Sequence, residues 1–149
     1  MSFEVDLKLS SWGHVLYKHG LEENGPVQAF FTNELLRASA PYTPFGETGL
    51  LQSTAILKPS SITYIMPYSR YLWEGKLMVD PITKKGAFYS PSYGFWSRPG
   101  VQKELTNRPL KFRGAPLRGP KWVERAWIDN KQQLLDSTQR FVDSGGGRK

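Results

Sequence analysis

The sequence contains no cysteine and only two histidines, His14 and His19, among its 149 residues. Without cysteine the chain forms no disulfide, and a thiolate metal site or a cysteine nucleophile is excluded. The two histidines are five residues apart, which on a helix places them about 140° from each other, so they cannot hold one metal ion together there. We therefore expect no metal site and no cofactor.

The strong local motifs of catalysis are missing as well. The chain has no glycine-rich phosphate loop, no His-Glu-x-x-His and no Gly-x-Ser-x-Gly. A general base would have to be a carboxylate such as Glu47, Glu74 or Glu104, and none of these lies in a paired arrangement. We expect no catalytic residue and predict that the protein is not an enzyme. A small hydrolase or nuclease is kept as a third alternative.

Long apolar runs are also absent. No stretch approaches the roughly 18 consecutive apolar residues that a membrane span needs, and residues 1–9 lack the basic start and continuous apolar run of a secretion signal. We therefore expect no membrane partner. The 39% of apolar residues is typical of neither a membrane protein nor a disordered chain. Because 149 residues is about the length of one domain, we predict a single folded domain over residues 1–143, with a flexible tail at 144–149.

Positive charge is what the sequence does have, and it is concentrated in one region. The net charge of the chain is +7. Residues 76–125 contain eleven lysines and arginines against three acids, a local charge of +8, whereas the rest of the chain has nine bases and ten acids. Such a basic stripe can lie along phosphates or an acidic protein, or it can keep a loop-rich region in solution.

Periodicity predicts the secondary structure of the first half. Residues 3–9 alternate apolar and polar side chains, which is the period of a half-buried strand. A short helix should follow and end at Gly20. A second helix should begin near Pro26, and its apolar stripe ends before Pro41. Residues 40–49 then form an ordered loop.

The next segments are predicted to be a hairpin and a short helix. Residues 50–57 and 61–66 look extended and should pair in an antiparallel hairpin. The helix that follows has Pro67 at its first position and Gly75 after its last turn, which are the preferred places of these two residue types. Residues 76–79 can return as a strand.

Residues 80–119 form the least regular part of the chain. Proline and glycine are too frequent there for a helix of any length, while aromatic and basic residues are interleaved, so we predict an extended arm or a long hairpin. Pro120 should start a final helix that runs to Val142, about 35 Å at 1.5 Å per residue. The predicted fold is thus α+β, with a small antiparallel sheet packed with helices, a long C-terminal helix and the basic, aromatic arm.

Several segments, taken in their order and spacing, resemble a known family. They are PYTP (41–44), TGLLQS (48–53), MPYSRYLWEGK (66–76), FWSRPG (95–100) and WVERA (122–126). This arrangement resembles the minor capsid proteins of tailed bacteriophages, and within them the neck or tail-completion proteins encoded between the head stopper and the tail tube. The resemblance covers residues 3 to about 140.

The resemblance implies a structural role without chemistry of its own. It implies an α+β subunit of the virion, assembled in the host cytoplasm, that joins the DNA-filled head to the tail. The expected partners are other copies of the chain in a ring of six or twelve, the neighbouring stopper, tail-terminator and tail-tube proteins, and DNA that passes through the lumen. A sequence-independent nucleic-acid-binding module is the alternative, and it predicts tight, salt-dependent binding to free DNA.

In this setting the arm supplies the candidate interaction residues. Those expected to contact an adjacent subunit or the next ring are Phe88, Tyr89, Tyr93, Phe95, Trp96 and Arg98. Those expected to face DNA or an acidic partner are Lys84, Lys85, Lys103, Arg108, Lys111, Arg113 and Arg118. In the alternative arrangement the arm folds back on its own sheet.

Overall fold

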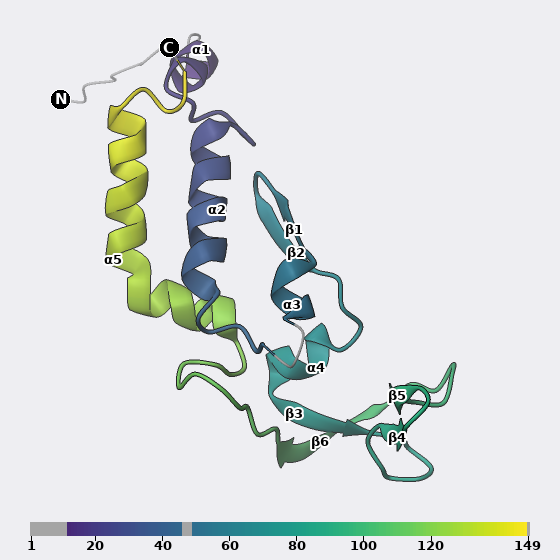
Figure 1. The fold of residues 1–149 in the computed structure, drawn as a ribbon. Helices are drawn as coiled ribbons and strands as arrows, with labels where there is room; N and C mark the ends of the chain where they lie inside the picture. The colour runs from purple at the N-terminus through teal and green to yellow at the C-terminus, as the bar shows by residue number, and fades with distance from the viewer. Residues whose placement is uncertain (1–11, 46–48, 149) are drawn as a thin grey trace, which may run out of the picture. The chain divides into compact units, whose positions relative to one another are not determined.

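The computed structural model describes residues 12–45 and 49–148 (Figure 1). Within these residues the chain is α+β with a long C-terminal helix, which confirms the predicted fold class. The strand predicted at residues 3–9 lies outside the described residues. The elements, in chain order, are α1 (Trp12–Lys18), α2 (Pro26–Ser39), α3 (Leu50–Ser53), β1 (Ala55–Lys58), β2 (Ser61–Tyr64), α4 (Ser69–Glu74), β3 (Lys76–Val79), β4 (Phe88–Ser90), β5 (Gly94–Trp96), β6 (Glu104–Pro109) and α5 (Trp122–Asp143).

The chain divides into two compact units. The first contains the described residues up to 38, residues 56–63 and the chain from 126 onward, and the second contains residues 39–55 and 64–125. The assignment of residues 1–143 to one domain stays a prediction.

Aromatic rings join two helices in the first unit. Pro26 is the first residue of α2, where its missing N–H leaves no helical hydrogen bond unmade. Phe30 of α2 stacks on Phe141 of α5 with 4.3 Å between ring centroids, and Phe31 meets Trp127 edge to face at 5.8 Å. The apolar stripe predicted for α2 is therefore used in packing against α5.

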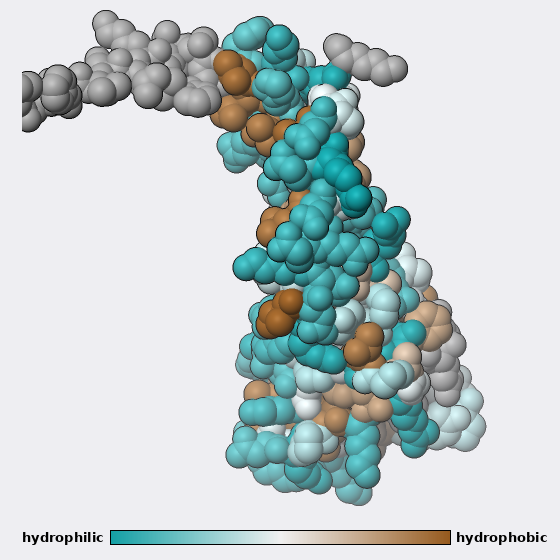
Figure 2. Space-filling view, turned by 90° about the vertical axis from the view of Figure 1, so that its left-hand side faces the viewer, coloured by the Kyte–Doolittle hydropathy of each residue, from teal (hydrophilic) through white to brown (hydrophobic). Residues whose placement is uncertain are grey.

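The outer side of α5 keeps some apolar residues exposed. Ile128 and Leu135, seven residues apart, are both exposed. Figure 2, which looks onto the side of α5, shows isolated brown patches within a mostly hydrophilic surface. Among the helices of the described residues, none is long and apolar enough to cross a membrane.

The chain after α5 packs against the start of the first unit. Arg148 forms an ion pair with Glu22, and its guanidinium lies 3.8 Å from the centre of the Tyr17 ring. Gly146 adopts a left-handed conformation with φ 59°, and a side chain there would collide with the carbonyl oxygen of His19. Glycine thus permits the close approach of these two segments. The flexibility of residues 144–149 stays a prediction.

The strand predicted at residues 50–57 is wrong in its first half. Residues 50–53 form α3, and the strand begins only at Ala55. Gly49 precedes the helix in a left-handed conformation with φ 64°, and the side chain of Gln52 donates a 2.5 Å hydrogen bond to the carbonyl of Ala40. Leu51 is buried. The tertiary contacts of Leu51 and Gln52 outweigh the extended pattern of the local sequence.

The predicted hairpin is otherwise present. β1 and β2 pair through the short turn at Pro59 and Ser60. In the first unit the hydroxyl of Thr32 on α2 lies 2.6 Å from the carbonyl oxygen of Pro59, so the turn is hydrogen-bonded to the helix. Thr32 is itself buried, which makes a partner for its hydroxyl necessary.

In the second unit, α4 begins two residues later than predicted. Its first residue is Ser69 rather than Pro67, because the N–H of Ser69 closes a separate turn with the carbonyl of Met66. Gly75 ends the helix in a left-handed conformation with φ 67°, as predicted. A Cβ at Gly75 would lie 2.7 Å from the ring of Pro120, so a larger residue would displace the start of α5.

Trp122 is the centre of the core of the second unit. Only 1% of its surface is exposed. Tyr64 and Trp73 both meet its ring edge to face, at centroid distances of 5.2 and 4.9 Å. Its indole Nε1 and the hydroxyl of Tyr64 are buried without a hydrogen-bond partner among the described residues. The core here is held by ring packing rather than by polar contacts.

The predicted arm at residues 80–119 is two structures instead of one. β4 and β5 pair antiparallel in a hairpin, with Phe88 opposite Trp96. β6 pairs antiparallel with β3, with Met78 opposite Leu105. The last part of the arm thus returns to the strand that precedes it, and only the β4–β5 hairpin projects (Figure 1).

Candidate interaction surfaces

The tip of the β4–β5 hairpin presents aromatic side chains to solvent. Tyr89 is 68% exposed, Tyr93 84% and Trp96 45%. Phe88 and Trp96 face each other across the hairpin with 5.1 Å between ring centroids. The backbone of Phe95 pairs with that of Tyr89. The Phe88–Trp96 ring contact thus lies within the hairpin, while Tyr89, Tyr93 and part of Trp96 are exposed to solvent.

The loop that carries the hairpin is closed by one ion pair. Asp80 follows the end of β3 and is buried. Arg98, just after β5, donates two hydrogen bonds to its carboxylate, from Nε to Oδ2 at 2.7 Å and from Nη2 to Oδ1 at 2.6 Å. The backbone N–H groups of Ile82 and Thr83 also donate to Oδ1, at 2.8 and 3.0 Å. Four donors thus fix the two ends of the loop to one carboxylate.

These donors change the titration of Asp80. Hydrogen bonding by the Arg98 guanidinium, assisted by the N–H of Thr83 and of Ile82, lowers the pKa of Asp80 to about 2, although burial acts in the opposite direction. Asp80 therefore stays ionised, and the loop stays closed, at any pH well above 4. Arg98 was predicted as a partner contact; the structure assigns its side chain to this closure, and contact with a partner stays a prediction.

Other bases of the stripe are distributed along the same loop and on β6. Lys84 forms a 2.9 Å ion pair with Glu104, and both side chains are more than half exposed. Lys85 and Arg108 are exposed, and Lys103 is half-buried. An ion pair whose side chains are both exposed, like that of Lys84 with Glu104, contributes little to stability.

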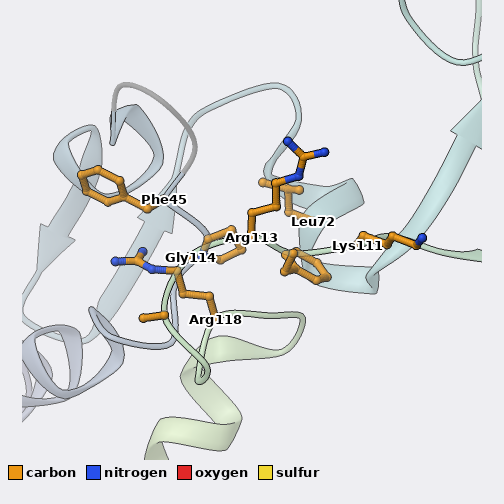
Figure 3. A pocket seen from close by; sticks show the side chains of 9 residues that line it. Phe45, Leu72, Lys111, Arg113, Gly114 and Arg118 are labelled. Carbon is orange, nitrogen blue, oxygen red and sulfur yellow. The ribbon is translucent and has the colours of Figure 1, made fainter.

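Three further bases of the stripe gather around a hollow in the second unit, which we call the basic hollow (Figure 3). Its volume is about 590 Å³, and its lining residues are Pro44, Phe45, Leu72, Lys111, Phe112, Arg113, Gly114, Ala115 and Arg118. Three of these nine residues are cations and none is an acid. The other side chains are apolar.

Arg118 is fixed in the basic hollow, whereas the other two cations are not. Its Nη1 donates a 2.6 Å hydrogen bond to the carbonyl of Thr43, and its guanidinium lies 4.9 Å from the centre of the Phe45 ring. Lys111 and Arg113 are exposed, and within the described part of the chain neither has an acidic partner. In Figure 3 Arg118 extends toward Phe45, Lys111 extends in the opposite direction, and Arg113 lies between them.

The structure thus separates the predicted site residues into two groups. The aromatic candidates share the β4–β5 hairpin, and Lys111, Arg113 and Arg118 share the basic hollow. Sequence reasoning missed Asp80, which it counted only as a charge, and Phe45, which it placed in a loop. For Phe45, the feature available in the sequence was its place at the end of the proline-rich segment 41–45.

The described residues contain no cluster of three or more side chains that could hold a metal ion. In the comparisons with known proteins, no family model, no curated protein and no solved structure matches this chain.

Proposed function

We propose that this chain is a structural subunit of the head–tail connector of a tailed bacteriophage, of the neck or tail-completion type, and that it acts in a ring of six or twelve copies. Its neighbours would be the stopper, tail-terminator and tail-tube proteins. The observation that carries this proposal is the exposed aromatic hairpin on a loop closed by Asp80 and Arg98. The resemblance of the ordered sequence segments supports the same role.

The hairpin has the properties of a protein-binding surface. Aromatic side chains bury about 150–250 Å² each when they are covered, and tyrosine and tryptophan are enriched at the centres of interfaces. A ring needs two different surfaces on each subunit, because a head-to-tail contact is heterologous. A rigidly closed loop lowers the entropy cost of presenting Tyr89, Tyr93 and Trp96 to a neighbour.

The hairpin can be tested without disturbing the fold. In phage particles that carry Tyr89→Ser with Tyr93→Ser, we expect full heads and finished tails to accumulate separately, because both side chains are more than two-thirds exposed and are available to a neighbouring subunit. Ile82→Ser is the matched control, since Ile82 is 76% exposed but lies outside the hairpin. Normal yields of joined particles from the double variant would overturn the proposal. If the hairpin is deleted instead of substituted, the deletion must end before Glu104, because β6 begins there and pairs with β3.

The basic hollow favours a second candidate, a sequence-independent nucleic-acid-binding module. Two exposed cations without acidic partners can contact phosphates, and such binding weakens steeply as salt is raised. Anisotropy of labelled single-stranded DNA between 50 and 500 mM salt, about a tenfold range, separates the two functions. Tight binding at low salt that is lost in Lys111→Ala with Arg113→Ala supports the second function. Weak binding at all concentrations supports the first.

A further inference from the structure

We propose that the basic hollow binds residues 3–7 of a second copy of this chain, as an extended segment with acidic and apolar side chains. This inference rests on the proposed ring, in which each subunit offers one surface to a neighbour and receives a different one. The donor residues lie outside the described part of the chain and are chosen by their sequence.

The composition of the basic hollow defines what it can bind. Its cations have no acid among the lining residues, so a ligand must bring negative charge. Its apolar lining includes Leu72 and Phe112, both half-buried, and Pro44, which is buried. Its volume of about 590 Å³ is that of a site for several side chains rather than one ion. The ligand is therefore both acidic and apolar.

The positions of the cations favour an extended ligand. Lys111 and Arg118 point in opposite directions across the basic hollow, with Arg113 between them (Figure 3). In an extended strand, alternate residues lie on the same side about 7 Å apart. An extended segment with acids at alternate positions thus presents two carboxylates on one side.

The floor of the basic hollow is poorly suited to nucleic acid. Binding of single strands relies on open aromatic faces on which bases stack. The guanidinium of Arg118 already lies over the Phe45 ring, and a Cβ placed at Gly49 would be 2.7 Å from the same ring. Arg118 thus occupies part of the Phe45 ring surface, although the side chain is still 44% exposed. A peptide is favoured over a base as the occupant.

Residues 3–7 have the required pattern. Phe3, Val5 and Leu7 alternate with Glu4 and Asp6, and no other segment of the 149 residues alternates apolar and acidic side chains over five positions. In an extended conformation the three apolar side chains share one face and the two acids the other. The apolar face can cover the floor, while the long side chains of Lys111 and Arg113 reach the acids from the rim.

Charge reversal on both sides tests this contact in the full-length chain. Variant A is Glu4→Lys with Asp6→Lys, and variant B is Lys111→Glu with Arg113→Glu. Arg118 is left intact because it bonds to the carbonyl of Thr43. We expect the unaltered chain to self-associate in sedimentation experiments. Each variant alone should associate about tenfold or more weakly, because like charges then face each other.

Mixing the variants is the decisive step. An equimolar mixture of A and B should associate again. The lysines introduced in residues 4 and 6 of A can pair with the glutamates introduced in the hollow of B, and the native acids of B can pair with the native hollow of A. The control is Lys84→Glu with Lys85→Glu, which reverses two exposed bases outside the basic hollow and should associate as the unaltered chain does. Circular dichroism checks that all variants are folded.

The inference is overturned if A and B associate like the unaltered chain, if their mixture is no better than either alone, or if the unaltered chain stays monomeric. It is also overturned if B loses DNA binding while its self-association is unchanged. None of these results alters the yield of joined particles in the hairpin experiment. A failure of this inference is therefore distinguishable from a failure of the proposed function.

Discussion

The two halves of the basic stripe use their charges differently. Between residues 84 and 98, Arg98 closes the loop on the buried Asp80, and Lys84 forms an exposed ion pair with Glu104. Between residues 111 and 118 the cations surround a hollow that has no acid in its lining. The first half exposes aromatic rings, and the second exposes charge.

This difference teaches that a local excess of positive charge does not locate a binding surface. Positive charge remains available to a partner only where no acid of the chain pairs with the lysine or arginine. Two of the three acids in residues 76–125, Asp80 and Glu104, pair with bases near the hairpin. Within the described residues, Lys111, Arg113 and Arg118 have no acidic partner, so they are available to attract one.

The largest effect is expected for a substitution in the core, which should destabilise residues 84–98 and 111–118 together. Trp122→Ala removes the buried ring that contacts Tyr64 and Trp73, and the free energy of unfolding should fall by about 3–5 kcal/mol. Trp122→Phe should cost much less, because the indole Nε1 has no hydrogen-bond partner within the described residues. Urea unfolding followed by circular dichroism measures both. Equal losses for the two variants would contradict this account of the core.

The second prediction is that Arg98→Ala should change the loop of residues 80–98 but not the basic hollow. Arg98→Ala leaves the buried carboxylate of Asp80 without its guanidinium, so the loop from residue 80 to 98 should open while the basic hollow is unchanged. Hydrogen exchange should show faster exchange at the N–H groups of Ile82 and Thr83. Exchange in residues 111–118 that rises equally would show that the two halves are not independent.

Low pH should likewise open the loop of residues 80–98 without changing the basic hollow. The folded-state pKa of Asp80, about 2, lies below the ordinary value near 3.9. The stabilisation by ionised Asp80 is thus complete above about pH 4 and is lost as the pH falls through about 2. Lysine and arginine keep their charge over this range, so the basic hollow is unaffected. Loop opening in hydrogen exchange already at pH 5 would contradict the assignment.

The smallest expected effect is that of Lys84→Ala. Its ion pair with Glu104 is exposed at both ends, so the free energy of unfolding should change by less than about 0.5 kcal/mol. Urea unfolding at low and high salt is the measurement. A loss as large as that of Arg98→Ala would mean that exposed pairs also hold the loop.

The parts of the fold that could be predicted are those with local signals. The helix from Pro26, the left-handed end at Gly75 and the long final helix follow from capping residues and apolar spacing. The start of α3 was missed because Gln52 is fixed by Ala40, twelve residues away. The pairing of β3 with β6 depends on contacts about 29 residues apart in the chain, such as Thr106 with Leu77, and no local pattern encodes such a pairing.

The candidate surfaces were predicted in composition but not in arrangement. The hairpin residues were identified because aromatics cluster between residues 88 and 96. The basic hollow could not be, since Phe45 and Leu72 reach it from segments far from residues 111–118. Likewise, Arg98 could not be assigned to Asp80, which is eighteen residues away and has no sequence feature that marks it as a partner.

The central claim is that this chain joins heads to tails, and electron microscopy of particles assembled without it tests that claim most directly. The account predicts DNA-filled heads and complete tails that are not attached to each other, with attachment restored when the chain is supplied and not when the Tyr89→Ser, Tyr93→Ser variant is supplied. Joined, infectious particles in the absence of the chain would contradict it.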